Sequence, residues 1–158
     1  MSLKLFEQIV RRTLTTDGSD STGGNTQGHP FEERSLHCGL PDKVRKLFDD
    51  GHYAEATFEA FKYVDKVVQR LSSSRETGQK LMMAVFSVDT PKIKLTPLSN
   101  NSEIDEQKGY QFLFSGAVMA IRNPRGHEIE INDDPDTCLD HLAFASMLLR
   151  RLDAYTDS

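Results

Sequence analysis

The sequence is poor in cysteine and contains no tryptophan. Its two cysteines, Cys38 and Cys138, lie far apart, and neither has a second cysteine near it. This pattern excludes the disulfide framework of small secreted domains and indicates a protein of the reducing cytoplasm. A single bridge, or a zinc site shared with His37 and His141, is a weaker reading, because adjacent ligands suit one metal ion poorly. We therefore expect no metal and no cofactor.

Long uncharged apolar segments are also missing. The longest one, Gly109 to Ile121, is shorter than the about 18 residues that a membrane-spanning helix needs. No signal peptide is expected, because charged residues interrupt the apolar ones near the N-terminus. These residues are Lys4, Glu7, Arg11 and Arg12. The sequence predicts a cytoplasmic protein with no membrane contact.

Positive charge is in deficit, with 19 Lys and Arg against 24 Asp and Glu, a formal net charge of -5. This balance argues against an extended nucleic-acid-binding surface but allows a small local basic site. The chain of 158 residues, with 37% hydrophobic and 27% charged residues, has the composition of a globular domain with its own core.

The chain divides at a segment rich in Gly, Ser, Thr and Asn. Apolar residues at helical spacing predict an amphipathic helix over Leu3–Leu14, and the polar residues that follow, up to Pro30, predict a loop or linker. We expect an N-terminal helical arm and flexible linker over residues 1–30, followed by a helical domain over residues 31–158.

The helical domain is expected to be an all-α bundle of about five helices with no competing strand pattern. The expected helices are one between Asp42 and Gly51, then Tyr53–Leu71, Arg75–Phe86 and Glu103–Arg122, and a last one that starts at Asp133-Asp134-Pro135. Residues 92–96 are expected to be a loop or a short extended piece. The helix before Arg122 is apolar nearly all round, which suits the centre of a bundle or a subunit interface. Pro124 is expected to end it at Asn123.

The segment Arg122-Asn123-Pro124-Arg125-Gly126-His127 is the strongest candidate for chemistry. The guanidinium of Arg122 suits phosphate oxygens, and His127 can give or take a proton near neutral pH. Asn123 can orient either group, so these three are the candidate catalytic residues. Arg125 is a further cation for substrate binding, as are Lys62 and Lys66 on the polar face of a helix.

Each of these residues also has an ordinary structural reading. Arg122 can cap helix-end carbonyls, Asn-Pro is a normal helix stop, and His127 can be an exposed loop residue beside acidic neighbours. The lysines can form a solvated helix face. The acidic residues around Asp133 and Asp134 are best explained as helix caps.

The wider sequence resembles the bacterial and prophage Ymh family over about Phe31 to Asp153. The resemblance rests on His52–Lys62, on Gly109–Met119, on Ile121–Glu128, on Asp133-Asp134-Pro135 and on Leu148–Asp153. The Ymh family belongs to the wider HEPN superfamily of helical bundles. Many members are metal-independent ribonucleases with an Arg, a polar residue and a His four to six positions on, and they commonly act as dimers in phage defence or toxin–antitoxin systems.

The resemblance thus implies a HEPN-like fold and an endoribonuclease in which Arg122, Asn123 and His127 are catalytic. The implied products carry 2',3'-cyclic phosphate and 5'-OH ends. The implied partners are RNA, a second copy of the chain, and an antitoxin or defence-system protein. The alternative is a HEPN-like dimer module that binds a nucleotide or a partner without catalysis, because some superfamily members bind rather than cleave. A purely structural dimer domain is a third reading.

Overall fold

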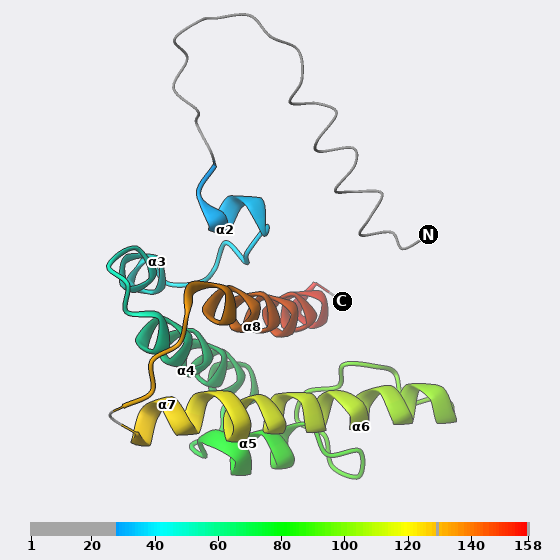
Figure 1. The fold of residues 1–158 in the computed structure, drawn as a ribbon. Helices are drawn as coiled ribbons and strands as arrows, with labels where there is room; N and C mark the ends of the chain where they lie inside the picture. Colours follow the sequence, from blue (N-terminus) through cyan, green and yellow to red (C-terminus); the bar gives the residue numbers. More distant parts are fainter. Residues whose placement is uncertain (1–27, 129, 158) are drawn as a thin grey trace, which may run out of the picture.

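The computed structural model describes residues 28–128 and 130–157, and every regular element in these residues is a helix (Figure 1). The expected all-α bundle is therefore confirmed. The expected helix over Leu3–Leu14 and most of the linker lie outside the described residues, so the arm and the division of the chain stay predictions.

The described residues form seven α-helices and one π-helix, and the shortest of them are α2 and α7. They are α2 (Pro30–Glu33), α3 (Asp42–Asp49), α4 (Tyr53–Ser72), α5 (Gly78–Val85), α6 (Asn101–Gly116), the π-helix η1 (Ala117–Arg122), α7 (Asn123–His127) and α8 (Pro135–Thr156). The helices of this part of the chain lack the combination of length and apolar character that a bilayer crossing requires.

The centre of the bundle is α4, against which α3, α5, η1, α7 and α8 all pack. Figure 1 shows it between α8 and the long helix formed by α6, η1 and α7. Its spacing of apolar residues buries Phe61, Val64 and Val68, each at most 2% exposed. Burial of one such side chain stabilises the fold by about 1.5–3 kcal/mol.

Local signals set most helix ends as expected. Gly51, with φ +81°, follows α3 and turns the chain into α4. Asp134 is the N-cap of α8, and its carboxylate accepts the N–H groups of Asp136 and Thr137. The helix expected from Arg75 begins later, at Gly78, where φ is +63°. The Gly78 N–H donates to the buried carboxylate of Asp65, which fixes this later start on α4.

The expected helix stop at Asn123 is wrong. Asn123 has helical angles (φ -64°, ψ -45°), and the helix continues as α7 through Pro124 to His127. The wider turn of η1 precedes this point, so Pro124 stands in the first turn of α7, where a missing N–H costs little. The six-residue motif is therefore helical almost throughout.

The long helix leaves an apolar face open instead of lying at the centre of the bundle. Phe112, Leu113 and Met119 are 55%, 42% and 50% exposed. Beside them lies a groove of about 250 Å³. It is lined by Phe112, Leu113, Gly116, Ala117, Ala120, Ile121 and, from α8, Phe144. We call this surface the α6–η1 face; its expected role as a subunit interface stays a prediction.

A buried glutamine attaches the loop after α5 to α6. Residues 92–96 form a loop, as expected, and Ile93 and Leu95 point into the core. The Gln107 amide donates to the carbonyls of Phe86 and Ile93, and its oxygen accepts the Leu95 N–H, at 3.1, 2.9 and 2.8 Å. Gln107 is fully buried, so these three bonds satisfy backbone groups that water does not reach.

Replacement of Gln107 by Leu should destabilise the protein by about 3 kcal/mol or more, because three buried backbone groups lose their partner. Urea unfolding followed by circular dichroism measures the change. Gln79→Leu, at an exposed position of α5, is the matched control and should leave the midpoint nearly unchanged. Equal midpoints for the two variants would contradict the role assigned to Gln107.

Candidate functional site

The motif begins at the last residue of a π-turn that joins two α-helical segments, and its other five residues form α7. In η1 the Asn123 N–H donates to the carbonyl of Val118, five residues back. Single π-turns inside long helices occur frequently at functional sites. This turn and α7 pack directly on α4, so Arg122, Asn123 and His127 stand on one rigid element.

The Arg122 guanidinium is held by neutral groups. Its Nη1 donates to Asn123 Oδ1 at 3.1 Å, and its Cζ lies 5.5 Å from the centroid of the Phe58 ring on α4. Its Nε is buried and has no hydrogen-bond partner in the described residues, nor does any carboxylate there pair with Arg122. The guanidinium is therefore held by an amide and an aromatic ring, without a neutralising carboxylate in the described residues.

The second arginine of the motif is engaged in a different way. Arg125 forms a bidentate ion pair with Asp133, both bonds being 2.6 Å, and its Nη1 donates to the carbonyl of Ile121 at 2.9 Å. The two side chains are only 9% and 7% exposed. This pair ties α7 to the segment before α8. The geometry favours a structural role for Arg125, and its expected role in substrate binding stays a prediction.

His127 is the last residue of α7 and is exposed. Its imidazole has no hydrogen bond or ion pair in the described part of the chain, including none to Arg122. A shared cleft for Arg122 and His127 therefore stays a prediction. The exposed imidazole is accessible to a substrate from solvent.

The two candidate lysines on α4 differ in their position. Lys62 Nζ lies 5.8 Å from the same Phe58 ring, which brings it to the Arg122 side of the bundle, and it also pairs with Glu59 at 3.2 Å. Burial raises the pKa of Glu59, but hydrogen bonds from Lys43 and Lys62 outweigh this and lower it. Lys66 is exposed and donates to Gln69. The structure thus places Lys62, like Arg122, beside the Phe58 ring.

The carboxylates before α8 act as caps and ion-pair partners. Asp134 caps α8, as expected, and Asp133 forms an ion pair with Arg125. His141 Nδ1 is buried 3.9 Å from Asp133 and has no hydrogen bond within the described residues. Burial lowers the pKa of His141, and the charge of Arg125 lowers it further. His141 is therefore a neutral packing residue beside the ion pair.

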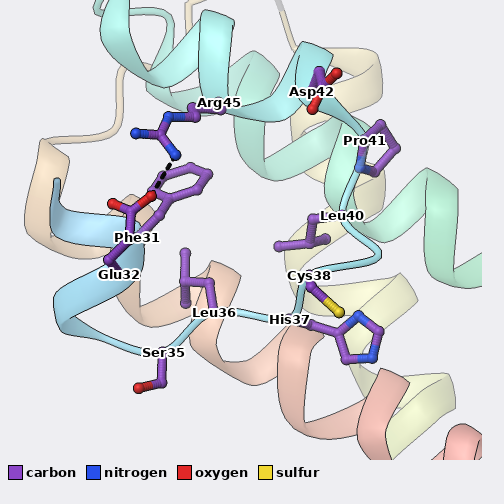
Figure 2. A pocket seen from close by; sticks show the side chains of 10 residues that line it. All are labelled: Phe31, Glu32, Ser35, Leu36, His37, Cys38, Leu40, Pro41, Asp42 and Arg45. Carbon is purple, nitrogen blue, oxygen red and sulfur yellow. Dashed lines mark hydrogen bonds and ion pairs between the residues drawn. The ribbon is translucent and has the colours of Figure 1, made fainter.

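A separate hollow of about 290 Å³ lies between α2 and α3 (Figure 2). His37 and Cys38 are at its edge, and the His37 imidazole forms a hydrogen bond of 2.6 Å with Asp153.

The second cysteine, Cys138, is buried elsewhere against Thr57, and burial raises the pKa of its thiol to about 11. Both cysteines are free, and no group of three or more His, Cys, Asp or Glu side chains in residues 28–128 and 130–157 could hold a metal ion. The weaker zinc reading has no support there.

Sequence reasoning missed two residues that shape the site. Phe58 has the helical spacing of the apolar core residues of α4, but it is half-buried and its ring lies beside Arg122 and Lys62. Gly126 carries no conformational signal in the sequence, yet a Cβ there would lie 2.6 Å from Phe58 Cε2. Helical periodicity cannot distinguish a core phenylalanine from one that supports a cation.

A family described as "Protein of unknown function (Hypoth_ymh)" matches residues 34–152. The chain belongs to the Hypoth_Ymh family. The match begins directly after α2, runs through most of α8 and includes the whole Arg122–His127 segment. No curated protein and no solved structure matches the chain. The expected Ymh family is thus confirmed for this Hypoth_Ymh chain, whereas membership of the HEPN superfamily stays a prediction.

Replacement of Arg125 by Met in this Hypoth_Ymh protein should lower the free energy of unfolding by about 3–5 kcal/mol, because Asp133 remains buried without its counter-charge. Chemical denaturation measures the loss. Arg34→Met is the matched control, since Arg34 pairs with Asp140 at the exposed surface and that pair contributes at most about 1 kcal/mol. If Arg125→Met lowers the free energy of unfolding no more than the control does, the structural role of Arg125 is contradicted and its role in substrate binding is favoured.

Proposed function

We propose that the protein is a metal-independent endoribonuclease of the HEPN type. Arg122 and Asn123 bind the scissile phosphate, and His127 transfers protons. The proposal places this activity in the cytoplasm, in a phage-defence or toxin–antitoxin setting, as the resemblance implies. Two free cysteines are compatible with a reducing compartment.

The observation that carries the proposal is the environment of the Arg122 guanidinium. Its guanidinium is fixed by Phe58 and Asn123, but no carboxylate in the described residues neutralises it. A cation that is held in place and not neutralised can stabilise the negative charge of a phosphoryl transition state at no cost of reorganisation. Arg125 has its counter-ion already, so the two arginines of the motif differ in their availability for an anionic substrate.

The proposed reaction needs one base, one acid and one anion-binding group. A base accepts the proton of the substrate 2'-OH as O2' attacks the adjacent phosphorus. The bond from phosphorus to O5' then breaks, and an acid protonates O5'. One His127 supplies one of these roles, so the proposal takes the second histidine from another copy of the chain. The products are a 2',3'-cyclic phosphate and a 5'-OH.

The α6–η1 face supports assembly into a dimer. Phe112, Leu113 and Met119 are exposed there, next to the small residues Gly116 and Ala120, which let a second helix approach closely. This face adjoins the motif directly, because Ile121 lines the groove and Arg122 follows it. A two-fold contact centred on this face would bring two copies of the motif near each other.

A non-catalytic module that binds a nucleotide or a partner is the second candidate function. It is favoured by the net charge of -5 and by the engagement of Lys62 with Glu59, which leaves little free positive charge for a long RNA. In such a module the same Arg122 would bind one phosphate group without any bond cleavage. The RNA experiment below separates the two candidates.

The purified protein should cleave RNA in EDTA and leave 2',3'-cyclic phosphate and 5'-OH ends. His127→Ala should lower the rate by roughly 10²–10⁴, the usual contribution of acid–base catalysis. Arg122→Ala should be comparably damaging, and Arg122→Lys should recover part of the rate, since lysine lacks the bidentate fork. Gel analysis of end-labelled RNA with end-group determination measures these outcomes.

The control substrate has a single 2'-deoxy nucleotide at the cut and should resist cleavage there. Ends that carry 5'-phosphate, or an activity that needs added Mg²⁺, would contradict the mechanism. Binding of nucleotides without cleavage would favour the module instead.

Leu113→Glu should convert the dimer into a monomer and reduce cleavage, because it introduces a charge at the centre of the α6–η1 face. Light scattering at micromolar concentration measures the mass. Ala84→Glu, at an exposed position of α5 outside the groove, is the control and should remain dimeric. A monomeric Leu113→Glu variant with full activity would show that one chain supplies the whole site.

A further inference from the structure

Phe58 lies at the meeting point of α4 and the motif. The Arg122 guanidinium carbon and the Lys62 ammonium nitrogen lie 5.5 and 5.8 Å from the centre of its ring. Cations within about 6 Å of a ring centroid are attracted by the electron density on the ring face. Both cations are thus within cation–π range of the same ring.

The other neighbour of the ring is the backbone of α7. A Cβ on Gly126 would lie 2.6 Å from Phe58 Cε2, 3.3 Å from Cδ2 and 3.4 Å from Cζ. The first distance is far below van der Waals contact, so the ring occupies space that only a glycine leaves empty. Gly126 therefore permits Phe58 to approach the motif, and the ring is confined between α7 and Arg122.

This arrangement holds the Arg122 guanidinium in place without pairing it with a carboxylate. A carboxylate would hold the guanidinium firmly but would also cancel its charge, as Asp133 does for Arg125. An aromatic face holds a guanidinium without cancelling its charge and without occupying its in-plane N–H donors. Asn123 accepts one N–H from Nη1 and Nε is buried, so the other N–H groups of the two terminal nitrogens are the donors left for phosphate oxygens.

We propose that Phe58 is a positioning residue: its ring, seated against Gly126, holds the Arg122 guanidinium in the orientation that binds the scissile phosphate. This inference rests on the proposed ribonuclease function and adds to it a residue outside the Arg-polar-His motif. Phe58 itself touches no reacting atom in this scheme and acts through Arg122.

The first experiment compares Phe58→Leu with Phe58→Tyr. The leucine variant loses the ring, and kcat/KM for RNA cleavage should fall about tenfold, mainly through kcat, whereas the tyrosine variant keeps the ring face and should stay within about twofold of wild type. The matched control is Phe31→Leu, because Arg45 lies over the Phe31 ring at 6.0 Å, outside the candidate site (Figure 2). Its activity should be unchanged.

Gly126→Ala tests the same contact from the opposite side. The added methyl group displaces the ring, so activity should fall although Phe58 is present. In the double variant with Phe58→Leu the methyl group meets no ring, so the two losses should not multiply. Multiplicative losses would overturn the inference.

The position of Arg122 is measured independently of cleavage by NMR. The side-chain protons of Arg122 should show an upfield ring-current shift that disappears in Phe58→Leu and persists in Phe58→Tyr. Wild-type protein without RNA cleavage would overturn the ribonuclease proposal. An active wild type with a fully active Phe58→Leu variant, or Arg122 signals that Phe58→Leu leaves unchanged, would overturn the positioning role alone.

Discussion

The packing of α4 on several sides at once is the constraint on which the other elements depend. Small buried residues, Ala56, Thr57 and Ala60, allow neighbouring helices to approach α4 closely, while Phe61 fills the space towards Phe144 on α8. The same helix presents Phe58 to the motif and Asp65 to the start of α5. A shift of α4 would therefore move the core and the candidate site together.

The two arginines of the motif have different roles. Arg125 forms a buried bidentate ion pair with Asp133, which fixes α7 to the segment before α8. Arg122 is fixed by an aromatic ring and an amide, and its charge is retained. The rigidity of the segment comes from one arginine, and the proposed reactivity comes from the other.

Features that depend on a few neighbouring residues could be predicted from the sequence. Asp134-Pro135 marks the start of α8 because capping is a local hydrogen-bond problem, and the apolar spacing of α4 reports a face that is buried along its whole length. The course of the chain through Pro124 could not be predicted in this way. It depends on the π-turn before it and on contacts with α4, which are distant in sequence. Of the site, the residue types at Arg122 and His127 were visible, whereas the ring beneath Arg122 was not.

The π-turn also sets the helical phase between the two halves of the long helix. A π-turn holds about one residue more than an α-turn, and one residue of an α-helix corresponds to a rotation of about 100°. Uniform α-helical winding would therefore rotate Gly126 away from Phe58 while the α6–η1 face stayed where it is. Gain of one residue between Gly116 and Arg122 would rotate the motif in the same way, whereas loss of one residue would convert the π-turn into an ordinary α-turn and keep Gly126 facing Phe58.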